Sequence, residues 1–345
     1  MTRVKKQHRS LLTCLPICVA IVAAGTLSLS CTSISKQRLE VQLSELDKNR
    51  PVAESGLQRG ELELDHDGES ISMEFVYHHA PALEPREGTI PLVLVHGTPS
   101  TLFAWSEVIY GTPDFEGFRT DRDVYAVEVV GHGLAPGDLA PYDFDVCARH
   151  VIAMAKALGI ERMHLAGSSY GGEFVWRAAL EDPERVASIV LLDSSGYERR
   201  EEDWLSEEVQ MRESSLADFG WMLNSRDRIT AALEPHFGTV PPGRVDEFYL
   251  VCSNAHNWKA MIDLAKDENG TRATEIPLIT QPALVVWGSN DIAYPPDVYA
   301  TRFVDDLPRG ELLLLEDTGH YPHEERPEQV VPALREFFTR VEAEE

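Results

Sequence analysis

The chain has 345 residues, of which 43% are hydrophobic and 26% charged, so it can form one large domain with an inserted subdomain and is too apolar to be disordered. Its formal net charge of −26 excludes nucleic acid as a partner, because a phosphate backbone would be repelled. We interpret the charge as a hydrated acidic surface; a preference for cationic substrates is the alternative.

The first 30 residues have the order of an export signal. Basic residues at positions 3, 5, 6 and 9 precede an uncharged apolar run from Leu11 to Leu29, and small residues lead to Cys31. This ending resembles the lipobox of bacterial lipoproteins, although Ser28 stands where that motif usually has Leu. The resemblance implies cleavage before Cys31 and its acylation. An uncleaved membrane anchor is the alternative, because a run of about 19 residues nearly spans a bilayer. Both interpretations place the protein in a bacterial cell envelope, at the membrane.

Residues 31–58 are polar and weakly patterned, and they are predicted to be a tether between this segment and the folded domain. Leu39, Leu43 and Leu46 could mark one short helix within it. From Gly60 onward the pattern changes to alternation. Residues 61–64 and 71–75 flank an Asp-Gly pair, which predicts a β-hairpin.

Buried strands and helices then alternate. Continuous apolar runs predict strands covered on both faces at residues 91–95, 124–130, 163–166, 186–192, 283–287 and 312–315. Helical stretches are predicted at residues 144–158, 171–180, 296–303 and 327–341. The alternation predicts an α/β fold with a doubly wound, mostly parallel sheet. Residues 197–276 break the alternation and are predicted to be a helical cap, inserted between core segments 59–196 and 277–345.

The strongest local motif is Gly-Ser-Ser-Tyr-Gly-Gly at residues 167–172. It follows an apolar strand and opens a helix, which is the context of the Gly-x-Ser-x-Gly nucleophile elbow. Such a turn holds the serine in strained backbone geometry with its hydroxyl exposed. The motif predicts Ser169 as a nucleophile; a tightly packed Gly/Ser turn without function is the alternative.

From about residue 60 to 340 the chain resembles capped α/β-hydrolase-fold proteins, in which the nucleophile is followed by an acid and then a histidine. The resemblance implies Asp291, in Val-Val-Trp-Gly-Ser-Asn-Asp, as the acid and His320, in Glu-Asp-Thr-Gly-His, as the base. Asp193 ends the strand before the cap, where some relatives place the acid. Asp317 is too close along the chain to support His320, and His323 is the weaker base candidate.

The loop His-Gly-Thr-Pro at residues 96–99 resembles the oxyanion loop of the same family. The resemblance implies that the backbone N–H groups of Thr98 and Tyr170 form the oxyanion hole. His96 is interpreted as structural, and His132, in Gly-His-Gly, as shaping a loop at the carboxyl edge of the sheet.

No cofactor or metal is predicted, because the sequence has neither a His-Glu-x-x-His motif nor paired cysteines. Outside the export segment, Cys147 and Cys252 are expected to be small buried residues. No pattern indicates an oligomeric state.

Serine at position 169 argues against haloalkane dehalogenases and epoxide hydrolases, which the sequence otherwise resembles but which use aspartate at the elbow. We therefore expect a serine hydrolase that cleaves a small-molecule carboxylic ester through an acyl-enzyme. Carbon–carbon bond hydrolysis and proline-iminopeptidase-like peptide release are the alternatives, as is a non-catalytic binding protein on the same fold. Glu173 and the acids of the cap favour the peptidase, whereas the missing His-Gly-Gly-Pro-Gly loop argues against it.

Overall fold

The structure is a computed structural model, and it describes residues 33–46, 56–66, 68–136, 139–204, 212–214 and 216–344. The predicted export signal and Cys31 lie outside these ranges. Within them, no helix combines the length and the apolar character needed to cross a bilayer.

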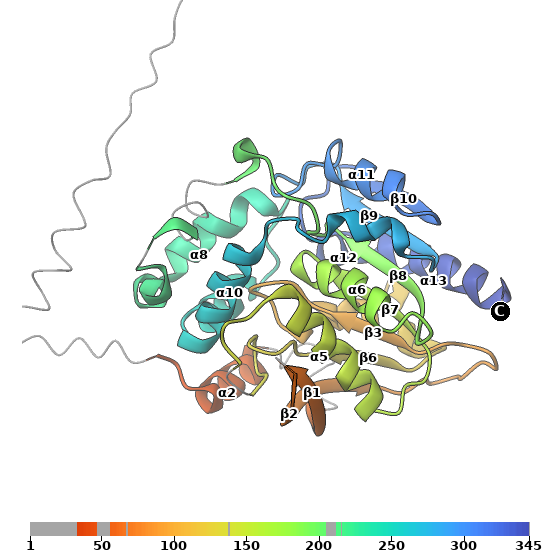
Figure 1. Cartoon of the computed structure of the whole chain (residues 1–345), viewed down its shortest axis with the longest axis horizontal. Coiled ribbons are helices and arrows are strands. Elements are labelled where there is room, and N and C mark those ends of the chain that lie inside the picture. The colour runs from red at the N-terminus through yellow and green to blue at the C-terminus, as the bar shows by residue number, and fades with distance from the viewer. Residues whose placement is uncertain are drawn as a thin grey trace, which may run out of the picture. The chain divides into compact units, whose positions relative to one another are not determined.

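An eight-stranded sheet forms the centre of the domain, in the order β1-β2-β6-β3-β7-β8-β9-β10 (Figure 1). The strands are β1 (Gln58–His66), β2 (Glu69–Ala80), β3 (Leu92–Val95), β6 (Val124–Val127), β7 (Met163–Ser168), β8 (Val186–Leu192), β9 (Ala283–Gly288) and β10 (Gly310–Leu315). The β1–β2 hairpin is antiparallel and pairs antiparallel with β6, whereas all strands from β6 to β10 run parallel. The predicted α/β fold with a mostly parallel sheet is therefore confirmed.

Helices cover both faces of this sheet because its central strands are apolar on both sides. In β3, Val93 and Val95 join the hydrophobic cluster under α5 (Phe144–Ala157) and α6 (Tyr170–Glu181), while Leu92 and Leu94 face the cluster under α13 (Pro327–Glu344). Helix α11 (Tyr299–Asp306) lies on the side of α5 and α6, and the short α12 (Pro322–Glu325) precedes α13. Cys147 and Cys252 are free and buried, as predicted.

One helical segment of the core was not predicted. The 3₁₀ helix η2 (Leu102–Trp105) and α4 (Ser106–Tyr110) follow β3, and a small ribbon of β4 (Gly111–Thr112) and β5 (Phe115–Glu116) and the 3₁₀ turn η3 (Phe118–Thr120) follow them. Trp105 is completely buried, so this segment fills the core on the α13 side rather than forming a surface loop.

The interval predicted as a cap is helical throughout its described elements. These are η4 (Glu201–Asp203), η5 (Ala217–Leu223), α8 (Arg226–Leu233), η6 (Glu234–His236), α9 (Arg244–Cys252), α10 (Ala255–Asp267) and η7 (Ala273–Leu278). The cap has its own apolar cluster around Phe248, Trp258 and Ile262, and Tyr321 of the core packs into that cluster. The cap therefore packs against the core at Tyr321, the residue that follows His320.

Residues 33–46, within the predicted tether, pack on the domain. They include α2 (Lys36–Leu46), the helix that the three leucines predicted; Leu39 and Leu43 are buried, whereas Leu46 is 37% exposed. The Ile34 N–H donates to the Ser253 carbonyl at 3.2 Å, and the Asn254 amide donates to the Ile34 carbonyl at 2.7 Å. This end of the described chain is therefore held against the start of α10 in the cap (Figure 1).

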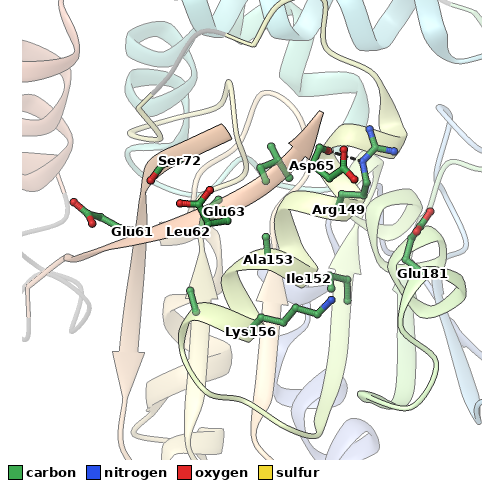
Figure 2. A pocket seen from close by; sticks show the side chains of 12 residues that line it. Glu61, Leu62, Glu63, Asp65, Ser72, Arg149, Ile152, Ala153, Lys156 and Glu181 are labelled. Atoms are coloured by element: carbon green, nitrogen blue, oxygen red, sulfur yellow. Dashed lines mark hydrogen bonds between the residues drawn. The ribbon is translucent and has the colours of Figure 1, made fainter. Parts of the chain in front are cut away.

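A cavity of about 590 Å³ lies between β1 and α5 (Figure 2). Its charged lining residues include Glu63 and Asp65 of β1 and Arg149 and Lys156 of α5; the Arg149 side chain donates to the Asp65 carbonyl at 3.2 Å. No histidine or cysteine lines it. The predicted catalytic and oxyanion residues, Ser169, Asp291, His320, Thr98 and Tyr170, do not line it.

Candidate active site

Ser169 has the backbone geometry of a nucleophile elbow. It stands between β7 and the first residue of α6, with φ 56° and ψ −125°. A positive φ is costly for a residue with a Cβ, and it persists because the surrounding structure fixes the turn. Gly171 permits this turn: a Cβ there would lie 2.5 Å from the carbonyl oxygens of Val95 and His96. The elbow is therefore pressed against the loop that follows β3.

That loop is the predicted oxyanion loop. A Cβ on Gly97 would lie 2.9 Å from the Ser169 Cβ and 2.7 Å from the Ser168 carbonyl oxygen, so the loop passes directly over the elbow. Tyr170 is the first residue of α6, where a backbone N–H has no acceptor within the helix. Thr98 follows Gly97. The structure thus brings the loop carrying Thr98 to the elbow carrying Ser169 and Tyr170.

His320 and Asp291 form a buried pair. The Nδ1 of His320 lies 2.9 Å from Asp291 Oδ2, while Asp291 Oδ1 accepts the N–H groups of Ala293 at 2.8 Å and Tyr294 at 3.2 Å. Burial alone would raise the pKa of Asp291, but the facing imidazole and the hydrogen bonds hold that pKa below its ordinary value. An ionised carboxylate only accepts, so Nδ1 carries the proton and Nε2 is left as the basic nitrogen.

Asp193, the alternative acid, lies beside this pair. It is completely buried at the end of β8, its Oδ1 accepts the Gly288 N–H at 3.0 Å, and Asp193, Asp291 and His320 each have a polar atom within 4.8 Å of the others. Burial raises the pKa of Asp193 well above its ordinary value, and the charge of Asp291 raises it further. Two adjacent buried carboxyls cannot both ionise, so Asp193 holds the proton of the pair.

The same three side chains are of the types that could hold a divalent metal. Backbone N–H groups nevertheless point at both carboxyls, from Gly288 to Asp193 and from Ala293 and Tyr294 to Asp291. These backbone donors would be repelled by a cation bound to the same oxygens. We therefore assign the cluster as an acid pair beside a histidine.

Ser169 belongs to the same edge of the sheet. Strands β7, β8, β9 and β10 are consecutive neighbours, and Ser169, Asp193, Asp291 and His320 follow them in that order. The Ser169 N–H donates to the Leu192 carbonyl at 2.9 Å, and the Asp193 N–H to the Val286 carbonyl at 3.0 Å. Among the described residues, no hydrogen bond joins the Ser169 hydroxyl to His320. Catalytic hydrogen bonds of this kind are often loose before substrate binds.

The other sequence candidates have structural positions. Asp317 is exposed, and its N–H donates to the Ser289 hydroxyl at 3.0 Å. His323 is buried and packs against Trp105 with the two rings tilted by 30° and their centroids 4.2 Å apart. His96, the first residue of the oxyanion loop, lies 3.0 Å from the buried carboxylate of Glu128. His132 contacts the Thr98 hydroxyl at 2.6 Å.

Contacts from the cap to the site were missed by the sequence analysis. Arg244 of α9 is completely buried; it donates to the Ser100 hydroxyl at 3.0 Å and pairs with Glu247 at 2.8 Å and with Glu324 at 2.6 Å. The Thr101 hydroxyl donates to Glu247 at 2.5 Å. Charged residues on a cap helix give no sequence indication of burial, so no pattern pointed to this network.

Two further contacts link the cap to the residues around His320 and Ser169. The His320 N–H donates to the carbonyl of His236 at 2.8 Å. Glu268, at the end of α10, accepts the hydroxyls of Tyr170 and Tyr294, each at 2.7 Å. The cap therefore contacts the oxyanion loop, the elbow and the histidine loop.

Residues 92–333 match the profile of the alpha/beta hydrolase family. The uncharacterized hydrolase YugF of Bacillus subtilis is 27% identical over 256 residues, covering 73% of this chain and 90% of its own. Haloalkane dehalogenase 2 of Mycobacterium tuberculosis is 27% identical over 266 residues, covering 73% and 89%.

Solved structures agree on the fold. A membrane phospholipase A, described as a bacterial virulence factor, superposes with a TM-score of 0.68 at 24% identity, covering 94% of this chain and 97% of its own. A thermophilic esterase from Thermogutta terrifontis gives a TM-score of 0.66 at 20% identity, covering 83% and 99%. With the family match spanning most of the core and cap, the chain belongs to the alpha/beta hydrolase family.

Proposed function

We propose that this hydrolase is a serine hydrolase that cleaves a carboxylic ester through an acyl-enzyme on Ser169. The observation that carries the proposal is the strained elbow serine, on the same sheet edge as a histidine whose Nδ1 is held by a buried carboxylate. Serine alone is a poor nucleophile, so a base that takes its proton during attack is required.

The steps follow from the groups present. The Ser169 hydroxyl attacks the ester carbonyl as His320 Nε2 accepts its proton, and Asp291 stabilises the resulting imidazolium. The N–H groups of Thr98 and Tyr170 bind the oxyanion. The intermediate then collapses, and the alcohol leaves with the proton from His320. His320 next takes a proton from a water molecule that attacks the acyl-enzyme, and the carboxylic acid is released as Ser169 recovers its proton from His320.

The structure weakens the case for a peptidase. Glu173, which favoured that alternative, is buried; its carboxylate accepts Arg177 Nη2 at 2.5 Å, Arg177 Nε at 3.1 Å and the Ser195 hydroxyl at 2.8 Å. In the acidic segment of the cap, Asp203 pairs with Arg200 at 2.7 Å. Because both acids already have partners, neither supports a site for a substrate ammonium. Cleavage of an ester requires only the nucleophile, the base and the oxyanion donors.

Labelling with a fluorophosphonate tests the nucleophile independently of the substrate. Wild type should become covalently labelled, Ser169→Ala should not, and the adjacent Ser168→Ala is the matched control that should retain labelling. A folded wild type that stays unlabelled would contradict the enzyme and favour the binding-protein alternative.

A substrate panel tests the ester assignment. We expect p-nitrophenyl esters to be cleaved at least a hundredfold faster by wild type than by Ser169→Ala, with aminoacyl-naphthylamides turned over far more slowly. If the amides were cleaved and the esters were not, the peptidase alternative would replace the esterase. Carbon–carbon bond hydrolysis is tested in the same panel with a β-diketone.

We also propose that the protein is exported and attached to the membrane of a bacterial envelope through lipid on Cys31. The basic start, the apolar run and the small residues before Cys31 support this. Cys31→Ser should abolish labelling by a fatty-acid probe and change processing, whereas Cys18→Ser, within the same segment, should change neither. Unchanged labelling and processing of Cys31→Ser would contradict acylation and favour an uncleaved anchor.

A further inference from the structure

Lys36, on the first turn of α2, is directed away from solvent toward the core. Its ammonium donates to the carbonyl of Gly133 at 2.8 Å and to the side-chain oxygen of Asn257 at 2.6 Å. Asn257 of α10 donates to the same carbonyl at 3.2 Å. Lys36 of α2 and Asn257 of the cap therefore both bind the same backbone oxygen, that of Gly133 in the loop after β6.

The charge beneath that loop explains why a cation is held there. Glu128 is completely buried, and a side chain on Gly133 would clash with its carboxylate. Burial lowers the pKa of Lys36 to about 8, and the nearby Glu128 charge opposes that shift. Lys36 is therefore mainly an ammonium at neutral pH, and it partly compensates a buried negative charge.

The loop that Lys36 contacts also contacts the oxyanion loop, through the side chain of His132. The Nδ1 of His132 lies 2.9 Å from the Val130 carbonyl, which can only accept, so Nδ1 carries the proton. Burial lowers the pKa of His132 to about 3, so the ring is neutral and Nε2 is an acceptor. The Thr98 hydroxyl, 2.6 Å from Nε2, must then be the donor. This assignment fixes the rotamer of Thr98, whose backbone N–H is a proposed oxyanion donor.

We propose that Lys36 is a positioning residue for the oxyanion hole, acting through Gly133, His132 and Thr98. This inference rests on the proposed function, because it concerns the same oxyanion hole. It goes beyond that function in assigning residues 33–46 a role in the rate of the reaction. An oxyanion donor acts only when charge develops on the substrate oxygen, so displacing one lowers kcat and leaves substrate binding unchanged.

The test compares Lys36→Met with Arg38→Met in the full-length protein. Methionine keeps the apolar stem of Lys36 but neither its charge nor its donors, whereas Arg38 is exposed on the same helix. For Lys36→Met we expect kcat on a p-nitrophenyl ester to fall about tenfold with KM within about twofold of wild type, less than the hundredfold or more typical for deleting an oxyanion donor. Arg38→Met should match wild type in both.

A second readout separates positioning from a general loss of structure. A trifluoromethyl ketone places an oxyanion in the hole once serine adds to it, so its Ki for Lys36→Met should rise by the same factor by which kcat/KM falls. Thr98→Val keeps the backbone N–H but loses the hydroxyl donor to His132, and it should show the same split between kcat and KM. If Lys36→Met does not fold, Lys36→Gln, which keeps a donor without the charge, is measured instead with the same expectation.

The outcomes distinguish this inference from the function on which it rests. Wild type that is not labelled by a fluorophosphonate would contradict the serine hydrolase itself. If wild type is labelled and the folded Lys36 variant has an unchanged kcat, the positioning role is wrong. The role is equally wrong if kcat falls while the Ki of the ketone stays constant, or if KM rises as much as kcat falls.

Discussion

Replacing Asp291 by Asn tests the acid pair directly. In serine proteases the corresponding change lowers kcat about ten-thousandfold, because the histidine adopts the wrong tautomer. Here a second carboxyl is present, since polar atoms of Asp193, Asp291 and His320 all lie within 4.8 Å of one another. Whether Asp193 can replace Asp291 depends on what keeps it protonated.

Burial and the charge of Asp291 both raise the pKa of Asp193, and the substitution removes the second of these causes. Two unit charges within 4.8 Å of each other repel by at least about 3.5 kcal/mol at the effective dielectric constant of about 20 that suits protein sites. Removing that repulsion favours ionisation of Asp193 by a factor of a few hundred, at about 1.4 kcal/mol per tenfold. Asp193 would then present a carboxylate near the imidazole.

We therefore expect Asp291→Asn to lose only about a hundredfold in kcat, and Asp291→Asn/Asp193→Asn to lose about the full ten-thousandfold. Asp193→Asn alone should stay within about threefold of wild type, because the amide can accept the Gly288 N–H and donate toward Asp291 as the neutral acid does. The assay is ester hydrolysis at neutral pH, with thermal unfolding to confirm folding. If kcat fell equally in Asp291→Asn and in the double variant, Asp193 would not be able to take over the role of Asp291.

Two further predictions concern buried charges that hold the cap and the C-terminal helix. Arg244→Met should lower the free energy of unfolding by about 3–5 kcal/mol, because it leaves Glu247 and Glu324 buried without their cation. Chemical denaturation measures this, with the exposed Arg226→Met as the control, and equal stability of the two variants would contradict it. Glu342 accepts Arg122 at 2.9 Å, His164 at 3.1 Å and the Ile90 N–H at 2.9 Å. Burial opposes its ionisation, but these partners hold its pKa below the ordinary 4.5, so its contribution is complete above pH 4.5 and is lost as the pH falls through the lowered pKa. Glu342→Gln should cost about 1.5–3 kcal/mol at pH 7, and the difference from wild type should shrink below pH 4.5; a difference independent of pH, or one shared by the exposed Glu336→Gln, would contradict this.

Much of the core could be predicted from the sequence because its signals are local. A buried parallel strand is apolar on both faces, so β7, β8 and β9 stand out as continuous runs, and the elbow joins such a run to a helix. The order of Ser169, Asp291 and His320 follows from the resemblance. These side chains lie at one edge of the sheet because each follows the end of one of several neighbouring parallel strands.

The missing parts depend on contacts between distant segments. The leucine spacing of α2 predicted an amphipathic helix but not the surface that it covers, since Lys36 and Gly133 are 97 positions apart. A basic residue such as Arg244 is usually exposed, so only the fold shows that it is buried. The sequence offers Asp193 and Asp291 as rival acids, whereas the fold brings both carboxyls into one cluster.

The contacts that the sequence did not predict converge on residues 97–101. Arg244 donates to Ser100, Thr101 donates to Glu247, and Thr98 donates to His132. The first two contacts come from cap helix α9 and the third from the loop that Lys36 holds. Because this loop carries Thr98, the proposed oxyanion donor, we expect changes in the cap to act on it through Ser100 and Thr101, in addition to their effect on the space for substrate. Cap variants should therefore alter kcat as well as KM, and an effect on KM alone would mean that the loop keeps its position without these contacts.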